Sequence, residues 1–447
     1  MSKEKFSIGH EAIFDAKKLG LSRTLLLGAQ HMFAMFGATV LVPVLTGLSV
    51  STTLLFAGLG TLLFHLLAKG KVPAFLGSSF AFLAGYWAIA PNKEVELLPY
   101  ACFGVACSGI LYFILSALIK VFGSNKVMKF FPPIVTGPII IAIGLNLSQS
   151  AIDNCSADWF IALVAIGVIV VCNVWGKGMV KIIPILLGVV VSYVTAAAMG
   201  KVDFTAVAEA AWIGSPIEWS RTVFGLFPGA DTSLLITSAI TIMPIALATM
   251  VEHIGDISAI SSTVGVNYMK DPGLHRTLFG DGAATMLASL FGGPANTTYG
   301  ENTGVLTLTR VYDPLVIRLA AVFAIIFSFC PKIAALISCM PAATMGGVSL
   351  VLYGMISAVG VRNIVETHVD FTKNRNVIIA ALILVLSIGI NYSSLGAITF
   401  SIKATTISLS GLATGSLAGV ILNAVLPGKD YSYNEDTPDD TGVNFEV

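Results

Sequence analysis

The sequence predicts an all-α polytopic membrane protein with fourteen membrane-spanning segments, arranged as two inverted repeats of seven. Three observations lead to this fold class: an apolar composition, fourteen apolar stretches, and similar proline-interrupted segments in the two halves. Of the 447 residues, 55% are hydrophobic and only 11% are charged, whereas soluble domains carry about 25% charged residues. The mean hydropathy is +0.86, and the apolar excess extends over nearly the whole chain. We therefore expect a membrane protein throughout.

A spanning helix needs about 20 apolar residues to cross the hydrocarbon core. Fourteen stretches reach or approach this length, and two of them are short and broken. They lie at residues 22–46, 51–69, 75–90, 98–121, 130–150, 157–175, 180–200, 233–258, 276–291, 296–310, 316–338, 341–362, 376–392 and 403–426.

The distribution of basic residues predicts the orientation of these segments. Loops that face the cytoplasm are usually enriched in Lys and Arg. If the N-terminus is inside, the outer loops carry few basic residues, namely Lys93, Lys201, Arg221 and Lys332. The inner loops carry Lys69, Lys71, Lys120, Lys126, Lys129, Lys177, Lys181, Lys270, Arg276, Arg310, Arg318, Arg362, Lys373 and Arg375. Both termini are therefore expected in the cytoplasm, and the acidic tail at 427–447 is expected to be flexible.

The third span of each half contains a proline-interrupted segment. The polar connection at 201–231 separates two groups of seven spans, and an odd number per group inverts the second group. In the first group Pro73 precedes the hydroxyl pair Ser78-Ser79; in the second, Pro294 precedes Thr297-Thr298. Matching breaks of this kind are typical of inverted-repeat transporters. We expect each segment to form a short strand and then a half-helix, which begins near Phe80 in one and near Gly300 in the other.

Three carboxylates lie within or beside predicted spans. Charged groups inside a bilayer are costly and usually serve substrate or proton binding. Glu252 and Asp256 are four residues apart, so they share one helix face. Glu301 follows Gly300 at the start of the second half-helix. Neighbouring carboxylates in a low dielectric do not both ionise cheaply, which suits proton binding. An interfacial position at the inner end of its span is the alternative for Asp256.

One further polar residue and three aromatic residues complete the candidate site. His31 follows Gln30 in the middle of the first span, where it either packs or contacts the site. Phe80, Tyr299 and Tyr353 are candidates for contact with a flat ring.

The hydrogen-bonding groups of the predicted site indicate what kind of ligand would fit it. Two carboxylates accept hydrogen bonds, and the first N–H groups of two half-helices, at Phe80 and Gly300, donate them. A small, flat molecule with paired donors and acceptors fits this pattern. A pyrimidine base such as uracil has it, and so do other amide-like ligands.

Five stretches of the chain resemble a known family. They are QHMFAMFGATVLVP at 30–43, LGSSFAF at 76–82, DPGLHR at 271–276, NTTYGEN at 296–302 and ENTGVLTLTR at 301–310. The last satisfies the family pattern Gln/Glu/Pro-Asn-x-Gly-x4-Thr-Arg/Lys/Gly. The sequence resembles, over essentially its full length, the nucleobase–ascorbate transporters, also called the second nucleobase–cation symporter family, and most closely their bacterial uracil-permease members.

This resemblance implies an architecture and an activity. The chain would divide into core segments at 22–121 and 233–338, gate segments at 130–200 and 341–426, and the tail at 427–447. The core would move against the gate, usually within a homodimer, in proton-coupled uptake across a bacterial inner membrane.

The resemblance also implies roles for individual residues. Glu252 and Glu301 would bind the base together with the backbone amides of Phe80 and Gly300, and Tyr353 would face the site from the gate. Glu at 301 favours uracil, because xanthine and urate carriers of the family usually have Gln there. The chain departs from the best-known bacterial uracil permease at Asp256, where that protein has a His assigned to proton coupling. We expect Asp256, Glu301 or Glu252 to carry the proton.

Several other classes of function are weighed against this interpretation. A xanthine or purine carrier of the same fold is the nearest alternative. An inorganic-anion exchanger is disfavoured because acidic residues repel anions, and a channel is disfavoured because the polar residues cluster at one depth. No nucleophile–base pair or metal motif indicates an enzyme, and the zero net charge gives no reason to expect nucleic acid binding. We expect no cofactor or metal, with membrane lipid, protons and the substrate as partners.

Overall fold

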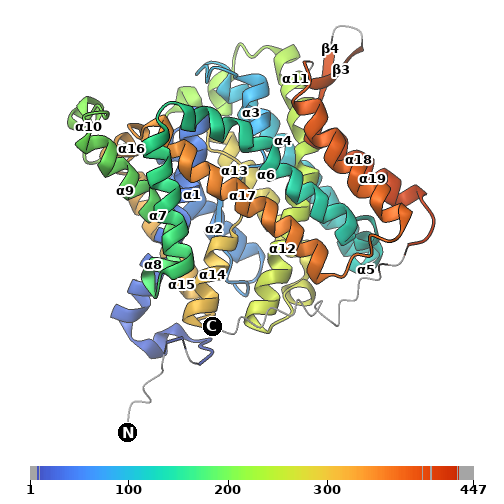
Figure 1. Cartoon of the computed structure of the whole chain (residues 1–447), viewed down its shortest axis with the longest axis horizontal. Helices are drawn as coiled ribbons and strands as arrows, with labels where there is room; N and C mark the ends of the chain where they lie inside the picture. Colours follow the sequence, from blue (N-terminus) through green and yellow to red (C-terminus); the bar gives the residue numbers. More distant parts are fainter. Residues whose placement is uncertain (1–7, 10, 395, 403–404, 430, 432–447) are drawn as a thin grey trace.

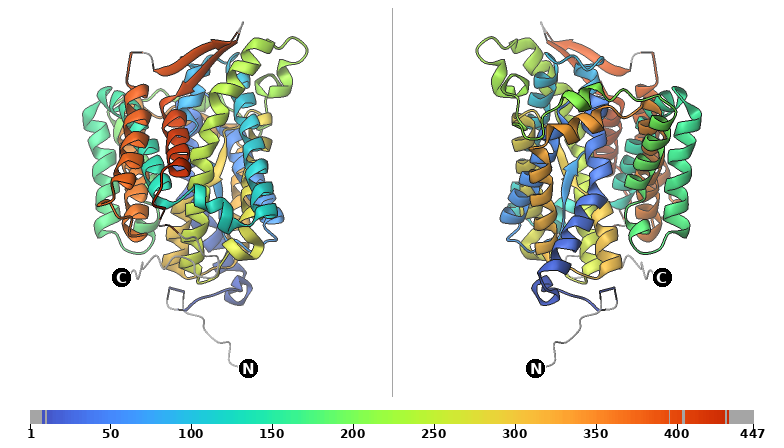
Figure 2. Two further views of the ribbon diagram at one scale, coloured as in Figure 1. Left: turned by 90° about the vertical axis from the view of Figure 1, so that its right-hand side faces the viewer. Right: turned by 90° about the vertical axis from the view of Figure 1, so that its left-hand side faces the viewer.

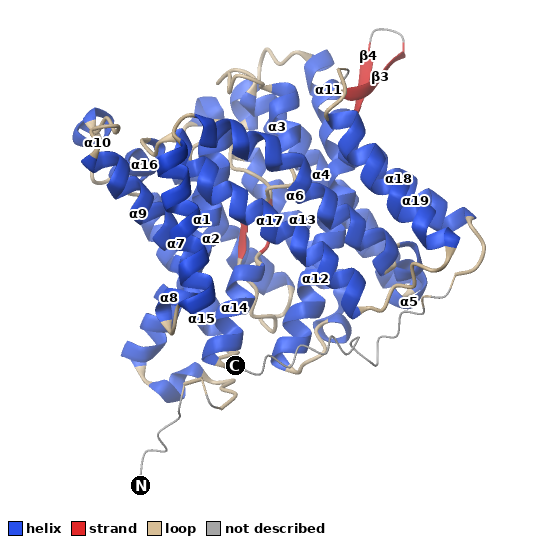
Figure 3. Ribbon diagram, viewed as in Figure 1, coloured by secondary structure: helices blue, strands red, loops and turns tan. Residues whose placement is uncertain are grey.

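The structure, a computed structural model, describes residues 8–9, 11–394, 396–402, 405–429 and 431. Helices make up most of the described chain (Figure 3). Those of the first half are α1 (Leu21–Thr46), α2 (Val50–Leu67), α3 (Leu83–Ile89), α4 (Leu98–Phe122), α5 (Ser124–Val127), α6 (Pro133–Ser156), α7 (Trp159–Trp175), α8 (Met179–Ile182), α9 (Pro184–Ala198) and α10 (Thr205–Glu209). Those of the second half are α11 (Thr232–Ile242), α12 (Ala246–Val264), α13 (Leu274–Leu290), α14 (Gly300–Thr309), α15 (Pro314–Ser328), α16 (Pro331–Ser338), α17 (Ala342–Glu366), α18 (Asn374–Asn391) and α19 (Gly411–Val425).

Four short strands accompany these helices. They are β1 (Leu76–Ser78), β2 (Asn296–Thr298), β3 (Ala397–Ile402) and β4 (Thr405–Ser410). The first two pair with each other, and so do the last two. The β1–β2 pair lies in the middle of the molecule, whereas β3 and β4 project from one end (Figure 1).

The structure confirms a mostly helical protein with several helices of membrane-spanning length. Among the described residues, seven helical segments are long and apolar enough to cross a membrane, or eight if the bent pair α15 and α16 counts as one span. The shorter apolar helices α7, α9 and α19 lie at three other predicted spans. The number fourteen and the division into core and gate stay predictions.

Two predicted spans differ from the structure. The segment at 316–338 is not one helix, because α15 and α16 meet at an angle of 87°. Pro331 causes this break, since proline cannot continue a helix but readily begins one. The segment at 403–426 is helical only from Gly411, and the hairpin of β3 and β4 precedes it. The β-branched residues Thr and Ile are frequent in the hairpin, and they favour strands over helices.

Figure 2 shows how the chain is oriented. The N-terminal described residues and the last turn of α19 lie at the same end of the molecule, while the β3–β4 hairpin lies at the opposite end. An even number of crossings requires both chain ends on one side. Most of the predicted flexible tail at 427–447 lies outside the described residues.

Two helices from different halves of the chain, α6 and α17, pack closely through glycine. Helices α6 and α17 are the fifth and twelfth predicted spans. A Cβ atom at Gly144 of α6 would lie only 2.2 Å from the backbone oxygen of Tyr353, and one at Gly360 of α17 would lie 2.7 Å from that of Gly137. Small residues at such contacts let two membrane helices approach each other. The packing of α6 on α17 therefore fixes the backbone of Tyr353, whose side chain is buried.

The N-terminal segment at 11–19 is fastened to the loop that follows α14. Ile13 donates its N–H to the Arg310 carbonyl and accepts from Tyr312, both at 2.8 Å. The Asp313 carboxylate holds two further backbone groups: Oδ2 accepts from Ala16 and Oδ1 accepts from Leu315, each at 2.8 Å. Asp313 therefore caps α15 and secures the N-terminal segment at once.

We expect Asp313→Ala to destabilise the protein by about 1–2 kcal/mol, because it removes a helix cap and a second hydrogen bond. Asp313→Asn should lose about half as much, since its amide oxygen replaces only one of the two acceptors. Thermal unfolding of the detergent-solubilised protein measures both. Asp15→Ala is the control, because the carboxylate of this exposed acid makes a local cap, accepting from the Lys17 N–H at 3.2 Å, rather than a bond to a distant segment. Equal stability of the Ala and Asn variants would contradict the double role.

Candidate functional site

Two interrupted spans meet at the centre of the molecule through their backbones. Strands β1 and β2 are antiparallel, with Gly77 opposite Thr297. The pairing extends beyond the strands, because Ser79 donates to Ala295 at 2.8 Å and Tyr299 donates to Phe75 at 3.0 Å. Backbone groups at bilayer depth need partners inside the protein, and these two segments supply them to each other. The predicted strands in spans three and ten are confirmed.

Gly77 and Tyr299 lock the strand pair. The Tyr299 hydroxyl donates to the Ser78 carbonyl at 2.8 Å, and its ring lies over Gly77. A Cβ atom at Gly77 would be 2.4 Å from this ring and 2.8 Å from the Thr39 hydroxyl. The ring that was predicted to face a ligand is thus buried, with 5% of Tyr299 exposed, and it holds the crossing point of the two spans.

We expect Gly77→Ala to destabilise the protein by about 1–3 kcal/mol, because the added methyl group overpacks this contact. Gly304→Ala is the matched control: Gly304 lies inside α14, and a Cβ atom there would meet nothing within 4 Å. The control should be as stable as the parent or more so, since Ala favours helix over Gly. Thermal unfolding compares the two. Indistinguishable unfolding temperatures would show that the Tyr299 ring can move aside to accommodate a methyl group, and they would contradict the prediction.

The three predicted carboxylates converge beside the strand pair. Glu252 and Asp256 lie one turn apart on α12, and Glu301 is the second residue of α14; all three are half-buried. Helix α12 packs against both α14 and β2. Asp256 is not merely an interfacial residue, because its Oδ2 accepts a hydrogen bond from the Thr298 hydroxyl at 2.7 Å. This bond ties α12 to the strand that leads into α14.

Open space borders the carboxylates. Helix α14 begins at Gly300, as predicted, and no side chain of the described residues caps its N-terminus. Gly300 is exposed, and Cβ atoms added at Gly300, Gly304 or Gly255 would meet nothing within 4 Å. The N-terminus of α14, with the positive end of its dipole, therefore faces space that a ligand can enter.

The first half-helix begins later than predicted. Its first residue is Leu83 rather than Phe80, because Phe80 starts a tighter turn in which its carbonyl accepts from the Leu83 N–H at 3.1 Å. Phe80 is buried and contacts Tyr353 of α17, with ring centroids 5.7 Å apart and planes at 73°. The structure thus brings together two predicted site residues from spans three and twelve.

His31 lies behind α14 rather than beside the open space. It is fully buried, and Asn302 donates its amide to both His31 Nδ1 at 3.2 Å and the His31 carbonyl at 3.1 Å. Because Asn302 follows Glu301 directly, the contact orients the first turn of α14. Through it α1 contributes to the position of Glu301.

Sequence reasoning missed a buried acid–imidazole pair. His253 Nδ1 lies 3.3 Å from Asp281 Oδ2, and both side chains are fully inaccessible. His253 follows Glu252 on α12, and Asp281 comes from the middle of α13. The sequence did contain a signal for this pair: Asp281 is a carboxylate within the apolar stretch at 276–291, and charged residues within predicted spans usually mark functional sites.

The chain is similar in sequence to a known family of membrane proteins. The model of the Permease family matches residues 22–395. A "Uracil permease" of Bacillus caldolyticus is 43% identical over 415 residues, which cover 90% of this chain and 92% of that protein. A "Uracil permease" of Bacillus subtilis (strain 168) is 40% identical over 413 residues, covering 89% and 91%.

A solved structure shares the fold. The transmembrane domain of the cyanobacterium bicarbonate transporter BicA has a TM-score of 0.57 at 14% sequence identity, covering 83% of this chain and 96% of that one. This similarity bears on the fold alone. The sequence matches identify the class: the chain is a multi-pass membrane protein that belongs to the Permease family. The resemblance to the nucleobase–ascorbate transporters that its motifs indicated is confirmed.

Proposed function

We propose that the chain is a proton-coupled uracil permease of a bacterial inner membrane, a transporter and not an enzyme. The observation that carries the proposal is the position of Glu301: it lies in the first turn of a half-helix at the centre of the molecule, beside exposed Gly300, and this half-helix packs against α12, which carries Glu252. Relatives at about 40% identity over most of the chain are named uracil permeases.

Uracil has two ring N–H donors and two carbonyl acceptors, and the site offers the complementary groups. Glu252 and Glu301 accept from the ring N–H groups. The backbone N–H groups of Gly300 and Phe80 donate to the carbonyls, with the positive end of α14 adding to the attraction. Phe80 and Tyr353 enclose the ring from spans three and twelve.

Proton coupling follows from the charge of this site. Three carboxylates at membrane depth repel one another, and moving them together across the membrane is costly. Protonation of Asp256, Glu252 or Glu301 removes part of that charge, so the loaded site moves more easily than the charged one. Asp256 is well placed for this role, because the Thr298 hydroxyl connects it to the start of α14.

Alternating access then arises from movement of the core against the gate. Phe80, which precedes α3, and the substrate groups on α12 and α14 belong to the core, whereas Tyr353 belongs to the gate. The contact of Phe80 with Tyr353 crosses the boundary between them and must break as the core moves. We expect a homodimer embedded in lipid, with both termini in the cytoplasm.

Competition experiments test the substrate. Purified protein in proteoliposomes should take up radiolabelled uracil, and excess unlabelled uracil should abolish the signal whereas xanthine and guanine should not. Thymine measures tolerance of a 5-methyl group. Asp256 is the feature that favours the second candidate, a xanthine or purine carrier, because purine carriers of the family also have Asp there. Uptake that xanthine abolishes and uracil does not would establish that candidate instead.

A further inference from the structure

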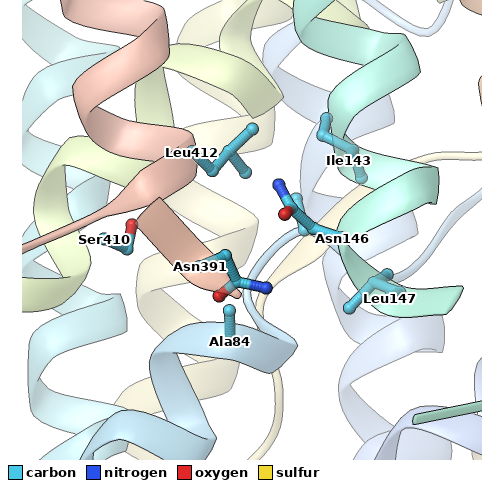
Figure 4. A pocket seen from close by; sticks show the side chains of 8 residues that line it. Ala84, Ile143, Asn146, Leu147, Asn391, Ser410 and Leu412 are labelled. Atoms are coloured by element: carbon cyan, nitrogen blue, oxygen red, sulfur yellow. The ribbon is translucent and has the colours of Figure 1, made fainter. Parts of the chain in front are cut away.

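A second polar site lies next to the Phe80–Tyr353 contact. A small cavity of about 10 Å³ separates the broken span from α6, α18 and the start of α19. Apolar side chains form most of its wall, and its polar lining comes from Asn146, Asn391 and Ser410. Figure 4 shows the two asparagine side chains pointing into this space from different helices.

The amide of Asn146 is available for recognition. Both of its polar atoms are buried, and neither has a hydrogen-bond partner among the described residues. Most buried polar groups are paired, and a polar side chain in the middle of a membrane helix is usually functional. Ser410 differs, since its hydroxyl caps α19 by accepting from Ala413 at 3.3 Å.

The cavity adjoins the proposed substrate site on the side of the β3–β4 hairpin. Ala81 in its wall follows Phe80 directly, and Gly144, two residues before Asn146, packs on the Tyr353 backbone. Asn391 is the last residue of α18, where the chain turns into the hairpin. That end of the molecule is opposite to the N-terminal segment (Figure 2), so it faces outward if the termini are cytoplasmic.

We propose that Asn146 and Asn391 form an outer binding subsite, which a planar imide such as uracil occupies on its way from outside to the carboxylates. This inference rests on the proposed function. Each amide offers one donor and one acceptor group, which together match the N–H and C=O edge of an imide. A cavity of this size holds about one water molecule, so the subsite is closed here and opens when α3 separates from α6 and α18.

Transport measured separately from each side tests this subsite. Asn146→Ala and Asn391→Ala, which lie on different helices, should each raise the KM for uracil offered from the outer face by about 5- to 10-fold, as expected for the loss of one or two hydrogen bonds. The KM from the inner face should stay at the parent value. Asn154→Ala is the matched control, because this amide of α6 bonds only its own helix, through Ser150 at 2.9 Å.

Equilibrium binding of radiolabelled uracil to the solubilised variants shows whether the central site is intact, and it should be unchanged. An outer KM equal to the parent value in both variants, or a KM raised equally from both sides, would overturn the subsite. Parent protein that fails to transport uracil would instead overturn the proposed function, so the two failures are distinguishable.

Discussion

Glu301→Gln is expected to lower uracil uptake by about 5- to 10-fold while the protein stays folded. The substitution keeps the size of the side chain and one acceptor oxygen, but it removes the charge that strengthens the hydrogen bond to the ring N–H. The difference between a charged and a neutral hydrogen bond is about 1–1.5 kcal/mol, which corresponds to this range of affinity. Initial rates of radiolabelled uracil uptake in proteoliposomes measure the effect.

Glu366→Gln is the control for this prediction. Glu366 ends α17 and pairs with Arg362 at 3.6 Å at the margin of the helix, so its neutralisation should change uptake less than about twofold, as for a surface ion pair. Uracil uptake at the parent rate in Glu301→Gln would remove Glu301 from the site. A simultaneous gain of xanthine uptake would show that residue 301 sets the choice of base.

Asp281→Ala is expected to destabilise the protein by about 3 kcal/mol, because it leaves the fully buried His253 without the carboxylate that lies 3.3 Å from its Nδ1. Both side chains are fully inaccessible and come from different helices. Thermal unfolding of the solubilised protein measures the loss.

The double variant His253→Leu/Asp281→Leu distinguishes the interaction between the two polar groups from the packing of their side chains. With both polar groups replaced by apolar ones, it should lose much less stability than the sum of the two single Leu variants, because neither partner is then left buried alone. Additive losses would show that the two groups act independently, and they would contradict a coupled pair.

Local sequence patterns predicted the broken spans. Pro73 and Pro294 before hydroxyl pairs indicated strands at bilayer depth, and the start of α14 at Gly300 followed from the adjoining glycine and carboxylate. Hydropathy alone misled at 316–338 and 403–426, because an apolar window does not distinguish a bent pair or a hairpin from one helix. Pro331 was the overlooked signal in the first case.

Contacts between distant segments were beyond the reach of sequence reasoning. The pairing of Phe80 with Tyr353, of His31 with Asn302 and of His253 with Asp281 depends on which helices pack together. The sequence indicated which polar residues were costly to bury, but their partners follow from the fold. The roles of the site residues in binding and coupling stay predictions.

The measurement that tests the central claim most directly is uracil accumulation in proteoliposomes with and without an inward proton gradient. The proposed symport predicts that an inward gradient drives uracil above its external concentration, and that a protonophore abolishes this accumulation. Uracil that merely equilibrates, at the same rate with and without the gradient, would contradict proton coupling through Glu252, Asp256 and Glu301.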